Sequence, residues 1–261
     1  MEKLINTIIK SRLENSIIDI KSIKKKPENI QDGYKLQKII NQKLKHYYLD
    51  SIGGYKIGCT TKVMQDYLQI NNPCAGSIFS KKIFHNQTSI RVEQNTKLGI
   101  ECEVAVTIGK DIRETTKLTL DKIKKYIKSF HTSIEIVQDR FQDYSIVDTA
   151  TLIADNFFNH SLVIGKPIVN WENLPIDNLH GKLFINDIYK DKGNSKMILG
   201  NPLKALLWIN SQTIKNGSYL KEEQIITLGS VIKTLWVDDF TNKYTFYIKE
   251  LGSCSVEFQK E

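Results

Sequence analysis

Three glutamates carry the clearest chemical signal in this sequence. Glu101 and Glu103 lie two apart in GIECEVAVTIG, residues 99–109, which alternates side-chain character as a strand does. On one strand face their backbone positions are about 6.5 to 7 Å apart, and two ionised carboxylates at that spacing repel by about 2 to 3 kcal/mol at an effective dielectric near 20. Water on a solvated outer face relieves this repulsion, and so does a bound cation.

Glu135 is the third carboxylate. It lies among Ile134, Ile136 and Val137 in TSIEIVQD, where an ionised carboxylate, if buried, needs a counter-charge, a hydrogen-bond donor or a metal. Three carboxylates on two strands can form one oxygen-rich site. Oxygen ligands without a His or Cys partner suit a hard ion such as Mg²⁺ or Mn²⁺ and leave positions open for water or substrate.

Lys56 is the candidate cation for such a site. It lies in the glycine-rich stretch GGYKIG, residues 53–58, and glycines let a backbone approach another group closely. Two interpretations stay open. Lys56 is either an ordinary surface charge on an edge strand or a cation that faces an anionic substrate or a developing enolate near the metal.

The other candidates give weaker signals. Cys74, in NPCAG, is either a nucleophile without an evident base or a small packed thiol. Asp155 and Asn156 stand beside two phenylalanines and either orient groups around a pocket or cap a turn. The four cysteines show no CxxC spacing, and we expect reduced thiols.

Composition indicates a globular enzyme-sized chain. Its 261 residues are 41% hydrophobic and 25% charged, enough for one large domain or two modest ones. The net charge of +8 admits nucleic-acid binding, but the one dense basic run, residues 21–28, has no aromatic interleaving and no binding motif. We expect no nucleic-acid partner, and the charge can instead attract a small anionic substrate. With no apolar run of 18 residues, we expect a cytoplasmic protein and no membrane contact.

The elements that must position these residues follow from hydrophobic spacing. Helices are expected over residues 4–13, over 34–44 with Asp32 as a possible N-cap, over 119–130, and over 201–217 with Asn201 as N-cap. From residue 78 onward short β-rich runs dominate. The pattern predicts an α+β fold in which a helical N-terminal region, residues 1–77, packs on a larger β domain, residues 78–261, as one compact unit.

The order of the segments resembles the fumarylacetoacetate hydrolase superfamily and, within it, the 2-oxo-acid hydratase and decarboxylase group. The matching pieces, which span nearly the whole chain, are GYKIGCTTKVMQ, IECEVAVTIGKDI, IEIVQDR, IADN, LGNPLKALLWI and ELGSCSVEF. The resemblance implies a mixed β-roll or sandwich with flanking helices, and a homo-oligomer. It implies that Glu101, Glu103 and Glu135 ligate one Mg²⁺ or Mn²⁺, that Lys56 is the active-site lysine, and that Arg140, Asp155 and Asn156 are pocket residues.

The implied activity is that of a metal-dependent hydro-lyase, which adds water to a short unsaturated 2-oxo acid or its dienol. Decarboxylation or carbon–carbon hydrolysis of metal-chelated 2-oxo acids is the alternative, and a non-catalytic binding subunit is another. Two departures from the group bear on this choice. Cys74 stands where hydratases commonly carry an aspartate, and Leu228 begins the segment LGS where a hydroxyl residue is usual. Cys74 and Ser230 are therefore predicted to contact substrate.

Overall fold

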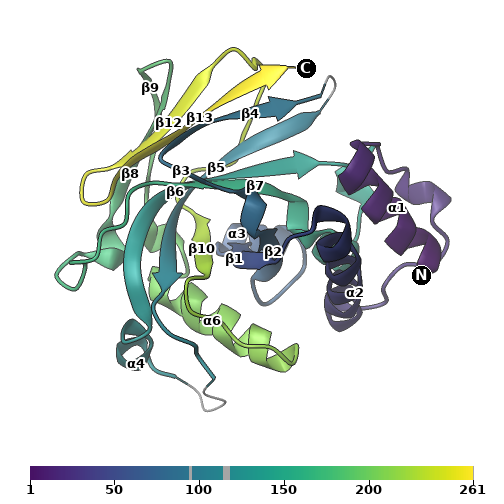
Figure 1. The fold of residues 1–261 in the computed structure, drawn as a ribbon, viewed down its shortest axis with the longest axis horizontal. Coiled ribbons are helices and arrows are strands. Elements are labelled where there is room, and N and C mark those ends of the chain that lie inside the picture. The colour runs from purple at the N-terminus through teal and green to yellow at the C-terminus, as the bar shows by residue number, and fades with distance from the viewer. Residues whose placement is uncertain (94–95, 114–117, 261) are drawn as a thin grey trace.

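A mixed eight-stranded sheet forms the centre of the computed structural model, which describes residues 1–93, 96–113 and 118–260 (Figure 1). Its strands, in spatial order, are β2 (Cys74–Phe79), β1 (Ile52–Gly58), β10 (Ile225–Ser230), β5 (Lys97–Ile108), β6 (Ile127–Asp139), β7 (Asn159–Ile164) and β3 (Ile83–His85), with β11 (Leu235–Trp236) also paired to β5. The β1–β10 and β3–β7 pairs are parallel, and the other pairs are antiparallel.

A second sheet of five strands packs against β6 and β7. Its strands are β4 (Gln87–Val92), β13 (Gly252–Lys260), β12 (Lys243–Ile248), β8 (His180–Ile185) and β9 (Ile188–Asn194), in that order. The apolar face of β5, which includes Cys102 and Val104, is buried in the same core as Phe246 and Cys254 of this second sheet. The polar positions of β5 therefore lie on the opposite face, away from the core between the sheets.

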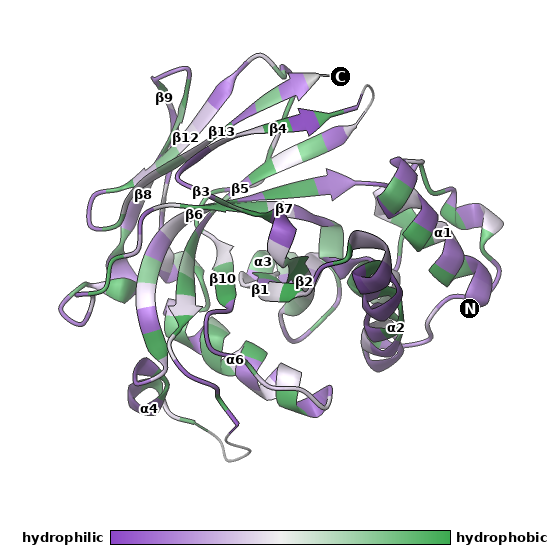
Figure 2. Cartoon of the chain, in the orientation of Figure 1, coloured by the Kyte–Doolittle hydropathy of each residue, from purple (hydrophilic) through white to green (hydrophobic). Residues whose placement is uncertain are grey.

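Helices flank the large sheet at its two ends. Near the N-terminus α1 (Glu2–Glu14) and α2 (Ile30–Tyr48) contact each other, and α2 packs on the short α5 (Thr149–Ala154). Figure 2 shows hydrophobic and hydrophilic residues on both long helices, as expected when one helix face meets the core. The prediction of Asp32 as N-cap was wrong. Asn29 caps α2 by accepting a hydrogen bond from the Asp32 backbone N–H, so the helix begins at Ile30.

The helix expected over residues 119–130 ends early, and the last four residues of that range are a strand. α4 spans only Leu120–Lys124, and β6 begins at Ile127. Phe130 lies opposite Val106 of β5, its backbone exchanges hydrogen bonds with Ile168, and its ring contacts Trp171. Apolar residues at this spacing suit a helix or a buried strand, and pairing with β5 decided between them.

The remaining helices agree better with expectation. α6 (Pro202–Lys215) starts after Asn201, whose side chain accepts from the Leu203 N–H, and it packs on β10. A brief helix, α3 (Lys62–Tyr67), follows β1. None of the helices in the described part of the chain is both long and apolar enough to cross a membrane. β1 and β2 belong to the large sheet, and a domain division at residue 77 stays a prediction.

Candidate metal centre and active site

Two central strands bring the three glutamates together. Glu101 and Glu103 lie on β5, and Glu101 pairs across the ladder with Glu135 of β6. One carboxylate oxygen from each residue lies within 4.8 Å of the others. Glu103 and Glu135 are 1% and 0% exposed, and the Glu101 side chain is 18% exposed. This burial excludes a solvated outer face as the explanation for the paired glutamates.

Glu103 is held through only one of its two oxygens. Its Oε2 accepts hydrogen bonds from the Thr227 hydroxyl and, at 3.1 Å, from the Gly229 backbone N–H, both on β10. Its buried Oε1 has no hydrogen-bond partner among the described residues. A buried carboxylate oxygen without a donor is costly, and a cation placed among the three glutamates would satisfy it.

Glu101 and Glu135 are also oriented by single donors. The Thr234 hydroxyl donates to Glu101 Oε1 at 2.7 Å. The Asn159 side-chain amide donates to Glu135 Oε1 at 2.9 Å. Each glutamate thus has one oxygen fixed by a neighbouring hydroxyl or amide, and the second oxygen of Glu135 lies 3.0 Å from the Lys56 ammonium.

Lys56 is buried beside this cluster. It is 1% exposed, and its Nζ lies 3.0 Å from Glu135 Oε2 and 3.8 Å from Glu101 Oε2. The ammonium also lies 5.4 Å from the centre of the Phe157 ring, within cation–π range. Burial alone lowers the pKa of Lys56, but the neighbouring glutamates outweigh it and raise the pKa above its usual value. Lys56 is therefore a charged internal lysine and not a surface residue.

The glycines around Lys56 make room for its side chain. Gly76 of β2 pairs with Lys56 of β1, and a Cβ at Gly76 would lie 2.2 Å from the Asn156 carbonyl oxygen and 3.1 Å from Lys56 Cγ. A Cβ at Gly58 would meet the Phe157 ring at 3.0 Å. Only glycine fits at these points, so the lysine stem can run across the sheet to the glutamates.

Burial and mutual repulsion oppose ionisation of the glutamates, and Lys56 offsets only part of this. Burial raises the pKa of Glu135 to about 7, with Lys56 lowering it and Glu101 raising it. Burial, together with Glu135 and Glu101, holds the pKa of Glu103 well above its usual range. Three carboxylates that repel one another, one of them with an unpartnered oxygen, fit a hard divalent ion such as Mg²⁺ or Mn²⁺.

Cys74 and Ser230 lie near this centre without bonding to the glutamates. Cys74 is buried opposite Gly58, and a hydrogen bond with Cys59 and burial raise the pKa of its thiol. The Ser230 hydroxyl donates to the carbonyls of Cys102 and Ile232 at 3.1 and 2.6 Å. The contact of Cys74 and Ser230 with substrate stays a prediction.

Arg140, Asp155 and Asn156 belong to a neighbouring polar cluster. Asp155 accepts from Arg12 at 2.5 Å and from Arg140 at 3.3 Å, and all three side chains are buried. Asn156 exchanges amide hydrogen bonds with Asn41 of α2. Among the described residues, none of the hydrogen bonds recorded for these side chains reaches the three glutamates. Their role as pocket residues stays a prediction.

Sequence reasoning missed several residues that orient the site. Thr227 sits in the apolar strand IITLGS, where a lone hydroxyl was a usable signal. Asn159 and Thr234 gave no comparable signal, because their partners lie 24 and 133 residues away in the chain. Arg12, at the end of α1, likewise reaches Asp155 across 143 residues.

Fold and glutamate cluster together define a protein class. The family described as fumarylacetoacetate (FAA) hydrolase C-terminal matches residues 64–255, which include the three glutamates, and the chain belongs to this family. Its α+β architecture of two mixed sheets with flanking helices is the family fold, as expected from the sequence.

Curated relatives cover most of the chain at low identity. A 2-keto-4-pentenoate hydratase of Paraburkholderia phymatum is 24% identical over 228 residues, 87% of this chain and 86% of the relative. 2-Keto-4-pentenoate hydratase 1 of Dechloromonas aromatica is 26% identical over 207 residues, 78% and 77% of the two chains. A 2-oxo-hept-4-ene-1,7-dioate hydratase of Escherichia coli is 24% identical over 209 residues, 77% and 76% of the two chains.

Solved structures agree on the fold. The 4-oxalocrotonate decarboxylase of Pseudomonas putida G7, complexed with magnesium and adipate, superimposes with a TM-score of 0.87 at 18% identity and covers 98% of this chain and 96% of its own. Fumarylpyruvate hydrolase from Pseudomonas aeruginosa, in complex with Mn²⁺ and pyruvate, gives a TM-score of 0.62 at 12% identity and covers 79% and 89%.

Proposed function

We propose that this protein is a divalent-metal-dependent hydratase that adds water to a short unsaturated 2-oxo acid or its dienol. The observation that carries the proposal is the buried cluster of Glu101, Glu103 and Glu135 with Lys56 at its side. Relatives that carry hydratase names and match this chain over most of their length support the same reaction class.

The three glutamates would hold Mg²⁺ or Mn²⁺. When bound, the ion supplies a Lewis acid that attracts the carboxylate and 2-oxygen of a 2-oxo acid and stabilises charge that develops there. The glutamates have a further task of their own. Because Thr227, Thr234 and Asn159 fix one oxygen of each carboxylate, the site is preorganised and needs little rearrangement during the reaction.

Lys56 acts in this proposal as a fixed positive charge and hydrogen-bond donor. Without metal, the neighbouring glutamates raise the pKa of Lys56, so the amine is protonated near neutral pH and can stabilise negative charge on a substrate oxygen. The Phe157 ring and the glycine-lined strand pair exclude water from the lysine, which strengthens its field at the reacting end of the substrate.

A decarboxylase of metal-chelated 2-oxo acids is the second candidate. The observation that favours it is the burial of Cys74 and Leu228, the two positions at which the sequence departs from the hydratases it resembles. The Cys74 thiol has a raised pKa and stays neutral, and Leu228 offers no titratable group. Addition of water needs a proton donor and acceptor near the distal double bond, whereas loss of carbon dioxide needs mainly an electron sink at the 2-oxo end.

One experiment tests the reaction class. Protein stripped of metal by a chelator is titrated with Mg²⁺ or Mn²⁺ and assayed with 2-hydroxypenta-2,4-dienoate and with an oxalocrotonate-type diacid. Metal-dependent consumption of the dienoate to a 4-hydroxy-2-oxo acid supports the hydratase. Carbon dioxide release from the diacid without any hydration refutes it in favour of the decarboxylase, and no turnover of either compound above the metal-only rate would indicate a binding subunit.

A matched pair of variants ties the activity to the site. Glu101→Gln removes the most exposed carboxylate of the cluster, and Glu172→Gln removes an exposed carboxylate elsewhere. We expect Glu101→Gln to weaken Mg²⁺ binding and to lower turnover at least tenfold, on the scale of losing one ligand or its supporting group. Glu172→Gln should match the parent protein.

We also propose a homo-oligomer in the cytoplasm. The four cysteines are free and buried, which agrees with a reducing compartment. Light scattering on the purified chain gives the oligomeric state, and a monomer at micromolar concentration would contradict that part of the proposal.

A further inference from the structure

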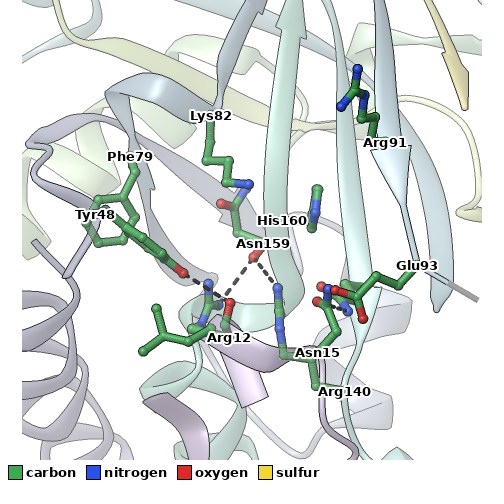
Figure 3. A pocket seen from close by; sticks show the side chains of 12 residues that line it. Arg12, Asn15, Tyr48, Phe79, Lys82, Arg91, Glu93, Arg140, Asn159 and His160 are labelled. Carbon is green, nitrogen blue, oxygen red and sulfur yellow. Dashed lines mark hydrogen bonds between the residues drawn. The ribbon is translucent and has the colours of Figure 1, made fainter. Parts of the chain in front are cut away.

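A pocket of about 280 Å³ lies beside the metal centre, and its wall is strongly cationic (Figure 3). Its lining includes Arg12, Lys82, Arg91, Arg140, Asn159 and His160. Neither Lys56 nor any of the three clustered glutamates lines it. The pocket is therefore a separate recess, bounded by the end of α1, the loop before β3, the end of β4 and the start of β7.

Positive charge exceeds negative charge in this pocket. Arg12 and Arg140 share one counter-ion, the buried Asp155. Lys82 and Arg91 form no recorded ion pair with any described residue, and the pocket contains one lining carboxylate, the exposed Glu93. Four cations against these two carboxylates leave an excess of two positive charges. Such an excess in a concave site attracts anions.

Arg140 provides an unused donor inside the pocket. Its side chain is 4% exposed, and its Nη atoms bond to Asp155 and to the Asn159 carbonyl. Its Nε is buried without a hydrogen-bond partner in the described part of the chain. A buried guanidinium N–H without a partner is costly, and it leaves the charge of Arg140 incompletely compensated in the pocket wall.

The cations are crowded enough to affect each other. Burial and the charges of Arg140 and Arg12 lower the pKa of Lys82. Burial, with Lys82 and the two arginines, holds the pKa of His160 well below its usual range, so the imidazole is neutral near pH 7. An anion in the pocket would relieve this mutual repulsion.

We propose that this pocket binds a small multivalent oxyanion, such as inorganic phosphate or a short dicarboxylate. The planar guanidinium group of Arg91 suits an oxygen pair on such a ligand, Arg140 adds positive charge to the wall, and Lys82 adds a mobile point charge. Figure 3 shows Lys82 and Arg91 on opposite sides of the pocket. This binding does not depend on the proposed hydratase activity.

The test uses the full chain, freed of metal by a chelator and dialysed. Isothermal titration at pH 8 measures the binding of inorganic phosphate and, separately, of succinate, with ionic strength held constant by sodium chloride. The probe variant Lys82→Gln/Arg91→Gln removes the two cations that hold no recorded ion pair with the rest of the described chain, so little native structure depends on them. The control variant Lys190→Gln/Lys192→Gln removes the same charge from exposed positions on β9.

The outcomes are distinguishable. We expect one site per chain for phosphate, for succinate or for both, and a dissociation constant that rises about tenfold or more in the probe variant, since two charge-assisted contacts are lost. The control variant should bind as the parent does. Preference for succinate over phosphate identifies a dicarboxylate ligand, and the reverse identifies phosphate. Equal binding by probe and control variants, or no binding beyond that of chloride, overturns the proposal.

Discussion

Replacement of Glu103 by glutamine should make the metal-free protein more stable than the parent. With metal bound, the same variant should be less stable than the parent. In the metal-free protein the three carboxylates lie within 4.8 Å, so two ionised neighbours repel by at least about 3.5 kcal/mol at an effective dielectric near 20. Lys56 and partial protonation, seen in the raised pKa of Glu103, cancel part of this repulsion. We expect Glu103→Gln to increase the free energy of unfolding by about 1 to 2 kcal/mol without metal.

The hydrogen bonds of the parent protein survive this change. The glutamine carbonyl can still accept from Thr227 and Gly229, and its amide takes the place of the unpartnered Oε1, where it faces the neighbouring carboxylates. With Mg²⁺ the parent becomes more stable than the variant. The parent gains about 2.7 kcal/mol at a hundredfold excess over the dissociation constant, and the variant, with one ligand fewer, gains much less.

Thermal unfolding in chelator and in Mg²⁺ at pH 8 measures both effects. A change of 1 kcal/mol shifts the midpoint by about 2 to 4 °C for a chain of this size class. The variant should therefore melt about 2 to 8 °C above the parent in chelator and below it in Mg²⁺. If Glu103→Gln melts lower in chelator and gains as much from Mg²⁺ as the parent does, the electrostatic account of the cluster is refuted. Glu172→Gln is the control.

Three further predictions concern the supporting residues. Lys56→Met strands the charge of the buried Glu135, and we expect a loss of about 3 to 5 kcal/mol in denaturant unfolding and at least a hundredfold lower turnover. Gly76→Ala places a Cβ 2.2 Å from the Asn156 carbonyl oxygen, and the unfolding midpoint should fall by about 3 °C or more while calorimetry still shows one transition. Burial lowers the pKa of His131 below 6.5, so the stability contributed by its neutral form is fully present above that pH and is lost as the pH falls. Between pH 7.5 and 5.5 the free energy of unfolding of the parent should fall by about 1 kcal/mol more than that of His131→Gln. Equal losses would contradict this.

Local periodicity was sufficient to place the paired glutamates. The alternation in residues 99–109 put Glu101 and Glu103 on one face, because side chains two residues apart point to the same face of any strand. The third ligand depended on register, which is not local. Glu135 is useful only because it pairs with Glu101, and a slip of one residue would turn it to the apolar face.

Contacts between distant segments explain what the sequence left undecided or wrong. The glycines around Lys56 signalled a close approach, but they did not reveal that Gly76 and Phe157 would complete the enclosure. Residues 119–130 have apolar spacing that suits a helix, yet pairing of Phe130 with β5 makes most of the second half a strand. In both cases the deciding partner lies outside any local window of sequence.

Asn159 explains why a cluster of arginines lies next to a site for a cation. Its carbonyl accepts from Arg12 and Arg140, while its side-chain amide donates to Glu135. The arginines thus fix the backbone from which the amide reaches the metal ligand, and Asp155 keeps their charge from acting on the glutamates unopposed. An anion that drew Arg140 toward the pocket would weaken its long 3.3 Å bond to that carbonyl. The position of Glu135 would then depend on which ligand the cationic pocket holds.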